Sequence, residues 1–208
     1  MIINKIRKSS GWIQLSLIGL LTLFLISGVN TSVESKSLNL IELINTTNNS
    51  KETLSLSNEV ITVDCNTENL IDTLRLANDN PGSYTINLSQ DCVYQLSTHD
   101  NINQNFDLNG LPIIASTITI NGRGAILESS HENLRAFEVA PEGELFLTGL
   151  EIRNFKSDDE GAAILNRGYL TINNSTFSKN TAIKGGAIFN IGELVIYNST
   201  FFYNSACC

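Results

Sequence analysis

Two segments in the second half of the chain repeat the same order of apolar and polar positions. Gly161 to Asn180 (GAAILNRGYLTINNSTFSKN) and Gly185 to Asn204 (GGAIFNIGELVIYNSTFFYN) share twelve of twenty residues at an offset of 24. Each copy holds three short runs in which apolar and polar side chains alternate, rich in β-branched and aromatic residues. Periods of 20 to 50 residues are typical of stacked solenoids. The pattern predicts an all-β fold, a right-handed parallel β-helix with three short strands per turn.

Fainter copies of the pattern precede these two. FEVAPEGELFLTGLEI (137–152) places apolar residues and a glycine in the same slots, and STITINGRGAIL (116–127) fits an earlier turn. No stretch of ten residues within a repeat has helical periodicity, which excludes arrays of helical hairpins. The solenoid is therefore expected to extend from residue 59 to the end of the chain.

Asparagine and glycine recur at the ends of the expected strands. Asparagine tolerates the left-handed backbone region, and asparagines stacked one coil apart can form a hydrogen-bonded ladder. Glycine suits turns that need a positive φ or a close approach of backbones. We therefore expect structural roles for four pairs, Asn166/Asn190, Asn174/Asn198, Gly161/Gly185 and Gly168/Gly192.

One helix is predicted ahead of the repeats, over residues 67–78. Its apolar residues fall at helical spacing, Asn66 or Thr67 can cap its start, and Asn80-Pro81-Gly82 ends it. β-type runs flank it, VITVDC before and YTINL and VYQL after. The end of a β-helix exposes unpaired backbone groups over an apolar interior. We expect this amphipathic helix to cover the N-terminal end.

The first residues predict export. Lys5, Arg7 and Lys8 precede an apolar run from Trp12 to Ile26, which is short for a bilayer span of roughly 20 residues. Residues 1–29 therefore fit a signal peptide or an uncleaved signal anchor, followed by a flexible linker over 30–58 that is rich in Ser, Thr and Asn. After Asn204 the repeat stops at SACC, so the C-terminal end is expected to be open or truncated.

The cysteines agree with export. In an oxidising compartment Cys65 and Cys92 are expected to form a disulfide that ties the helix to the first coil. Metal binding by these two cysteines is the weaker interpretation, because no histidine lies near them in the sequence. Cys207 and Cys208 are too cramped to bridge each other easily and receive no assigned role.

Composition narrows the range of partners. The chain is 42% hydrophobic and 16% charged, which excludes a disordered protein, and its formal net charge is −8. It has no basic stripe with interleaved aromatics, so no nucleic-acid partner is expected. An acidic surface is repelled by anionic lipids, and membrane contact is expected through the N-terminal apolar segment or a missing C-terminal anchor.

The repeats resemble those of secreted bacterial β-helix proteins of the pectate-lyase-like superfamily. Polymorphic outer-membrane proteins carry GGA[IL] followed by FxxN, which Gly185 to Ile188 and Phe201 to Asn204 match. A CSLREA-type N-terminal segment has a β run, a cysteine and a leucine-rich helix. Ile61 to Cys65 and Leu70 to Asn78 resemble it, although Leu74 to Ala77 read LRLA and the cysteine lies farther upstream. The resemblance implies export, a β-helix and surface display, without a defined activity.

Polysaccharide lyases share this fold, so a catalytic site is an alternative for this chain. They use Ca²⁺ held by clustered carboxylates and an Arg or Lys base. The candidate metal ligands are the acidic run Asp158-Asp159-Glu160, expected in a loop, with Lys184 opposite Glu160 one repeat later. A solvated turn is the simpler interpretation of this run. The available arginines are Arg123, Arg135, Arg153 and Arg167, and the histidines are His99 and His131, each next to an acid and expected at the surface.

The sequence therefore predicts no catalytic, cofactor-binding or metal-binding residue. Calcium is the one cofactor considered, and Asp158, Asp159 and Glu160 are the residues that would hold it. Phe201 is expected to point inward like Phe177, which leaves Phe202 outward, either to stack on a sugar or to pack beneath a further segment. The sequence therefore predicts an exported cell-surface module with a structural or adhesive role, with surface glycans or proteins as partners. The alternative is a carbohydrate-active lyase or hydrolase of the same fold.

Overall fold

The computed structural model describes residues 58–80, 82–103 and 107–206. The predicted leader over 1–29, the linker over 30–58 apart from Asn58, and Cys207 and Cys208 lie outside the described residues.

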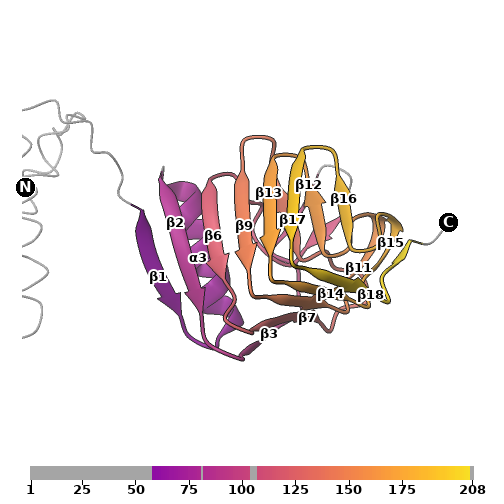
Figure 1. Cartoon of the computed structure of the whole chain (residues 1–208), viewed down its shortest axis with the longest axis horizontal. Helices are drawn as coiled ribbons and strands as arrows, with labels where there is room; N and C mark the ends of the chain where they lie inside the picture. Colours follow the sequence, from indigo (N-terminus) through magenta and orange to yellow (C-terminus); the bar gives the residue numbers. More distant parts are fainter. Residues whose placement is uncertain (1–57, 81, 104–106, 207–208) are drawn as a thin grey trace, which may run out of the picture. The chain divides into compact units, whose positions relative to one another are not determined.

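Parallel strands from successive coils stack side by side into a β-solenoid (Figure 1). The front sheet contains six strands in the order β1 (Glu59–Val63), β2 (Ser83–Leu88), β6 (Thr117–Asn121), β9 (Glu144–Thr148), β13 (Tyr169–Asn173) and β17 (Glu193–Tyr197). The lower sheet contains β3 (Val93–Leu96), β7 (Ile126–Ser129), β10 (Glu151–Arg153), β14 (Thr176–Ser178) and β18 (Thr200–Phe202). The rear sheet contains β8 (Phe137–Val139), β12 (Ile164–Asn166) and β16 (Ile188–Asn190).

A corner sheet forms a fourth set of strands that the sequence did not predict. It contains β11 (Lys156–Glu160), β15 (Thr181–Lys184) and β19 (Ser205–Ala206), which follow the strands of the lower sheet in each coil. The prediction of three strands per turn was therefore one too few in these coils. The segment Thr181–Lys184 has one apolar residue facing inward, the buried Ala182, and so gives little alternation to recognise.

The register confirms the predicted repeat. Ile164 pairs with Ile188, Leu170 with Leu194 and Phe177 with Phe201. Equivalent residues of the two copies therefore lie next to each other on adjacent parallel strands, 24 residues apart in the sequence. The fainter copies are in register too, since Leu145 pairs with both Ile118 and Leu170.

The second coil is longer than the others. Asn87 and Asn121 occupy equivalent positions on β2 and β6 but are separated by 34 residues, against 24 or 25 in the last two coils. The additional residues include an antiparallel pair, β4 (Asn101–Ile102) and β5 (Leu108–Asn109). The strands on either side of this hairpin stay in parallel register.

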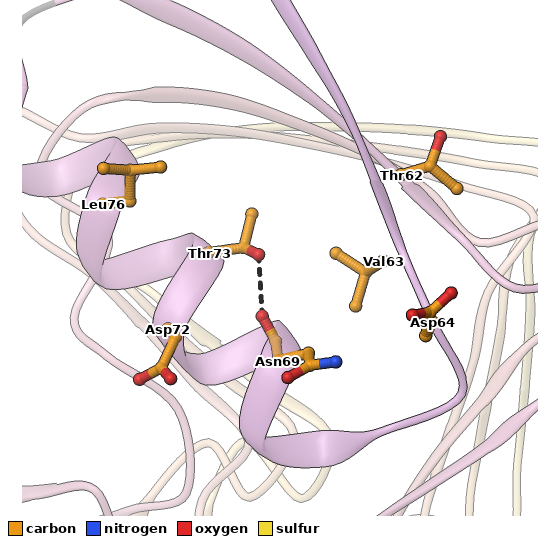
Figure 2. A pocket seen from close by; sticks show the side chains of 7 residues that line it. All are labelled: Thr62, Val63, Asp64, Asn69, Asp72, Thr73 and Leu76. Atoms are coloured by element: carbon orange, nitrogen blue, oxygen red, sulfur yellow. Dashed lines mark hydrogen bonds between the residues drawn. The ribbon is translucent and has the colours of Figure 1, made fainter. Parts of the chain in front are cut away.

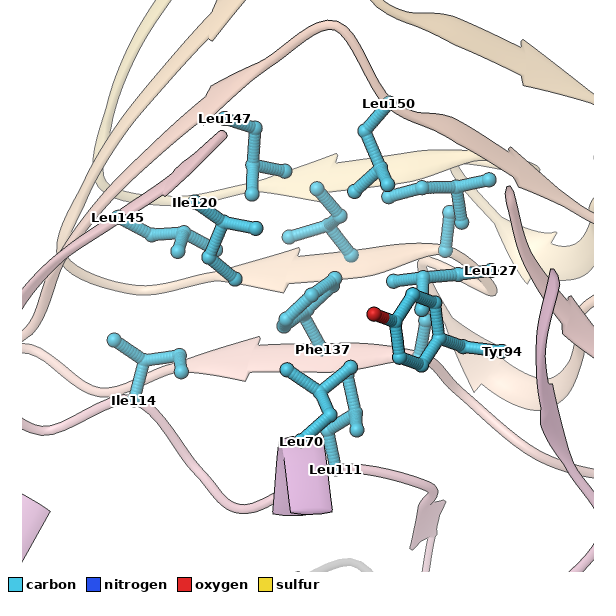
Figure 3. Packing of buried hydrophobic residues seen from close by; sticks show 14 of the residues in the cluster. Leu70, Tyr94, Leu111, Ile114, Ile120, Leu127, Phe137, Leu145, Leu147 and Leu150 are labelled. Carbon is cyan, nitrogen blue, oxygen red and sulfur yellow. The ribbon is translucent and has the colours of Figure 1, made fainter. Parts of the chain in front are cut away.

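Inward side chains of all three main sheets fill a continuous apolar interior (Figure 3). Leu145 and Leu147 from the front sheet face Leu127 and Tyr94 from the lower sheet, with Phe137 of the rear sheet between them. The hydroxyl of the buried Tyr94 lies 3.0 Å from the Asp64 carbonyl oxygen, to which it can donate. The predicted stacking of Ile, Leu and Phe into a continuous apolar core is confirmed.

The predicted helix is present as α3 (Thr67–Asp79). Asn66 caps it, because its Oδ1 accepts hydrogen bonds from the backbone N–H groups of Glu68 and Asn69. The helix connects the parallel strands β1 and β2, so it takes the place of strands in the first coil. Its residues Leu70, Leu74 and Ala77 are fully buried, and Leu70 reaches the interior seen in Figure 3. The helix thereby closes the N-terminal end of the apolar core.

A disulfide joins Cys65 to Cys92, as the sequence predicted, with 5.6 Å between the Cα atoms. Cys65 lies between β1 and α3, and Cys92 precedes β3. The bond therefore fixes the start of the helix to the second coil.

The recurring asparagines and glycines have the predicted structural roles. Asn166 donates from Nδ2 to Oδ1 of Asn190 at 2.6 Å, and Asn174 and Asn198 have φ values of 47° and 44°. Gly161 and Gly185 have φ values of 54° and 60°. A Cβ atom on Gly192 would lie 2.1 Å from the carbonyl oxygen of Gly168, and one on Gly168 would meet the backbone of the coil before it. A third pair, Asn180 and Asn204, forms a further ladder that was not assigned from the sequence.

The last coil leaves its inward residues open to solvent. Ile196 and Phe201 are 41% and 40% exposed, whereas their counterparts one coil earlier, Ile172 and Phe177, are fully buried. No described strand pairs with the outer edges of β16, β17 and β18.

Candidate functional site

The acidic run Asp158-Asp159-Glu160 lies on a strand, β11, and the prediction that it forms a loop was wrong. Lys156 pairs with Thr181 and Ser157 with Ala182, and the register then shifts before Glu160 pairs with Lys184. The buried Ser157 anchors this strand although its neighbours are charged. Pairing with β15 therefore overrides the turn-like composition.

Each carboxylate of the run already has a partner. Lys184 donates to Glu160 at 3.1 Å and lies 3.5 Å from Asp159, while Asn133 donates to Asp158. The hydrogen bond to Glu160, aided by the charges of Glu160 and Asp159, raises the pKa of Lys184. The predicted position of Lys184 opposite Glu160 is confirmed. Two of the three acids of the run, Asp159 and Glu160, therefore share one cation, Lys184, from the next coil.

A calcium site at this run was the weaker alternative to a solvated turn, and it stays untested. Among residues 58–80, 82–103 and 107–206, no three side chains of His, Cys, Asp or Glu gather closely enough to hold a metal ion. The carboxylates of the run contact the side chains of Asn133 and Lys184. The positive ammonium group of Lys184 would repel a divalent cation bound beside it.

An acid and a base line up on the outer side of the lower sheet. Arg153 on β10 pairs in register with Glu128 on β7, and its Nε and Nη2 atoms lie 2.8 Å from Glu128 Oε2. Glu151 lies 3.3 Å from the same guanidinium. The hydrogen bond that Arg153 donates to Glu128 is the largest cause that raises the pKa of Arg153. Arg153 is therefore held in the protonated form, which is opposite to what a general base needs.

Arg135 has the most buried charged side chain in the described part of the chain, and the sequence alone assigned it no role. It is fully buried beside the hairpin of β4 and β5. Its Nη2 donates to Asp107 at 2.8 Å and to the Glu160 carbonyl at 2.7 Å, and its Nη1 donates to Asn109 at 2.9 Å. The guanidinium therefore fastens the hairpin to the end of β11.

Glu138 completes this buried cluster from the rear sheet. Its Oε2 lies 3.6 Å from Arg135 Nη1 and accepts hydrogen bonds from Asn103 and Asn109 at 3.0 Å each. Its Oε1 lies 3.3 Å from Nε of Arg167. The cluster brings Arg135 and Arg167 together on the carboxylate of Glu138. Because this carboxylate has four partners, its arrangement is typical of a buried structural ion pair. The apolar residues around Arg135 in LRAF were the available sequence signal for its burial.

The remaining candidates lie apart from one another. His99 is exposed between β3 and β4, and Arg123 is exposed in a turn with φ of 55°. His131 Nδ1 lies 3.1 Å from the backbone nitrogen of Asn133, whose side chain also binds Asp158. His131 is thus linked to the acidic run through Asn133, a connection that the sequence did not indicate.

The aromatic residues of the last coil follow the predicted alternation. Phe201 stacks on Phe177 with ring centroids 4.8 Å apart and nearly parallel planes. Phe202 instead contacts Tyr203 edge to face at 5.4 Å, and both are exposed.

A hollow of about 320 Å³ lies between β1 and α3 (Figure 2). Its walls combine apolar Val63 and Leu76 with polar side chains, and Thr73 donates to the Asn69 carbonyl at 2.7 Å. Figure 2 shows that the carboxylates of Asp64 and Asp72 lie on opposite sides of the hollow. They do not converge as a catalytic acid pair does.

Comparison of the chain with protein-family models, curated proteins and solved structures gave no match. Among the described residues, no helix has the length and apolar character needed to cross a membrane.

Proposed function

We propose that this chain is an exported cell-surface module, built on a β-helix, with a structural or binding role rather than a catalytic one. The observation that carries the proposal is that charged side chains of neighbouring coils neutralise each other. Arg153 pairs with Glu128, and Lys184 pairs with Glu160. An opposite charge favours the charged form of each partner, so groups held in such pairs are poorly suited to transfer protons.

The disulfide supports export. Bonds such as Cys65–Cys92 form and persist in oxidising compartments and are rare in the cytosol. The apolar run before the linker supplies an export signal of the expected length.

The finer family is part of the same proposal. We infer a right-handed coil of the pectate-lyase-like type with repeats like those of polymorphic outer-membrane proteins. Gly185 stands at a positive φ and Phe201 faces inward, as a repeat of GGAI followed by FxxN requires.

Export is tested with the full chain in a bacterial host. Cell fractionation and protease treatment of intact cells should place the chain outside the cytoplasm with Cys65 and Cys92 oxidised, as read by thiol labelling and mass spectrometry. Replacing the apolar run of residues 12–26 with polar residues is the matched control. A reduced protein that stays in the cytoplasm with the leader intact contradicts the proposal.

A second candidate, a polysaccharide lyase, is favoured by one observation. Arg153 and Glu128 lie on outward positions of adjacent strands, which is where a lyase places its base and acids. Incubation with polyuronates and Ca²⁺ should give no unsaturated product by ultraviolet absorbance. Turnover that Asp158→Ala or Arg153→Met abolishes, and that Glu132→Gln on an exposed loop leaves intact, overturns the non-catalytic proposal.

A further inference from the structure

The residue types on the outer face of the front sheet change along the solenoid. On β2 and β6 its outward residues are small and polar, namely Ser83, Thr85, Asn87, Thr117, Thr119 and Asn121. On β9, β13 and β17 aromatic side chains and carboxylates replace most of them. The six strands lie side by side in Figure 1, so these residues share one broad surface.

Two aromatic rings form the centre of this second region. Phe146 on β9 and Tyr169 on β13 have ring centroids 5.7 Å apart and are tilted by 48°. Both point outward, because Leu145, Leu147 and Leu170 beside them in the strands are buried. Both side chains are half-buried on a sheet, where an apolar ring surface can be covered with little loss of conformational entropy.

Carboxylates stand on both sides of Tyr169. Glu144 and Glu193 pair with Tyr169 in register from the neighbouring strands, which places their backbones two strand spacings, roughly 10 Å, apart. Glu144 accepts a hydrogen bond from Thr117 at 3.3 Å, and the Glu193 carboxylate has no hydrogen bond or ion pair with any described residue. No Lys or Arg occupies an outward position on the six strands.

We propose that Phe146, Tyr169, Glu144 and Glu193 form a binding surface for an amine-bearing glycan. The aromatic faces contact the C–H face of the sugar rings, and the carboxylates and rings attract the protonated amino groups. Charge complementarity selects this partner, because an acidic face without a cation repels polyuronates and gives a neutral glycan no ionic contact. The inference deepens the proposed binding role and rests on it.

Isothermal titration calorimetry of the full chain with three soluble saccharides tests the proposed binding. Glucosamine oligomers at a pH where their amines are protonated should bind, N-acetylated oligomers should bind at least about fivefold more weakly, and polygalacturonate should not bind. Raising salt should weaken binding of the first. A polylysine peptide distinguishes a cationic protein partner from a sugar.

Tyr169→Ala and the pair Glu144→Gln with Glu193→Gln should each lower the affinity for glucosamine oligomers by at least about fivefold. The controls are Tyr203→Asn, an exposed aromatic outside the front sheet, and the pair Glu68→Gln with Glu132→Gln, two exposed acids elsewhere. Both controls should bind like the unchanged chain. Circular dichroism shows whether each variant is folded.

Three results overturn the inference. They are equal binding of the N-acetylated oligomer with no effect of the glutamine pair, binding of polylysine without binding of any sugar, and binding of none of these probes. In each case an exported chain that is inactive on polyuronates leaves the proposed function standing, so the two failures can be told apart.

Discussion

At the scale of single residues, the buried charge of Arg135 is held by several hydrogen bonds. Arg135 makes hydrogen bonds to Asp107, Asn109 and the Glu160 carbonyl from a position without solvent exposure. Removing one member of a buried ion pair leaves its partner charged and desolvated.

Arg135→Met should therefore lower the free energy of unfolding by about 3–5 kcal/mol. Arg153→Met is the matched control, because its ion pairs lie on the partly exposed outer side of the lower sheet and contribute about 1 kcal/mol or less. Urea denaturation followed by circular dichroism measures both. Equal losses in the two variants would contradict the structural role of the buried cluster.

Lys184 gives the corner sheet a dependence on alkaline pH. Its pKa is raised above 10.5 by the hydrogen bond to Glu160, so the protonated form is favoured by folding. The stabilisation is fully present below pH 10.5 and is lost as pH rises through the higher folded pKa.

The difference in melting temperature between the unchanged chain and Lys184→Met should therefore stay constant up to about pH 10 and shrink above it. Thermal melts at intervals from pH 7 to the alkaline limit measure this difference. A difference that stays the same from pH 7 to the alkaline limit is the result that contradicts the assignment.

At the scale of elements, the helix α3 shows how local sequence sets a boundary. Asn66 accepts two backbone hydrogen bonds and adopts the extended conformation of an N-cap, and three buried residues follow at helical spacing. The sequence predicted this helix to within one residue, because cap and periodicity agree.

Asn66→Ala should lower the free energy of unfolding by about 1 kcal/mol, since two backbone N–H groups lose their acceptor. Asn69→Ala carries the same change three residues later, at an exposed position inside the helix. It should be neutral or slightly stabilising because alanine has the higher helix propensity. Urea denaturation of both variants measures the difference, and equal destabilisation of the two would contradict the capping role of Asn66.

Elements with weak alternation were harder to predict. The strand β11 was expected as a loop because three acids in a row suggest solvent, yet pairing with β15 holds it extended. The hairpin of β4 and β5 had no apolar pattern of its own, and its buried anchor Arg135 comes from another coil. Contacts between residues about 25 positions apart set these features, and a single sequence shows such contacts only where the repeat is regular.

At the scale of the whole molecule, the coils form a stack in which each coil stabilises its neighbours. In such a solenoid stability is the sum of coil and interface contributions, and terminal coils have one interface fewer. Phe177 and Phe201 occupy the same slot and stack on each other, but one is fully buried and the other is 40% exposed.

Phe177→Ala should therefore lower the free energy of unfolding by about 3–5 kcal/mol, and Phe201→Ala by less than half of that. Hydrogen exchange should show the same gradient, with the slowest amides in β9 and β13 and faster exchange in β17 and β18. Equal costs at the two positions would mean that the last coil is covered in solution.

The regular repeat made the interior predictable, while the outer faces depended on register. Leu170 and Leu194 could be placed inward from alternation alone. The register of three strands places Glu144, Tyr169 and Glu193 in one row. This register was harder to predict, because the repeat is less regular in the earlier copies. The position of Arg153 beside Glu128 is of the same kind.

The hairpin in the second coil has a consequence for how such a chain can change. Nine or ten residues beyond the usual period leave β2 and β6 paired without a shift, since the excess lies at the corner between the lower and rear sheets and carries its own anchor in Asp107 and Asn109. Corners of this kind can accept foreign peptides or whole loops while the strands keep their pitch. The scaffold is thus suited to grafting at its corners and intolerant of single insertions within its strands.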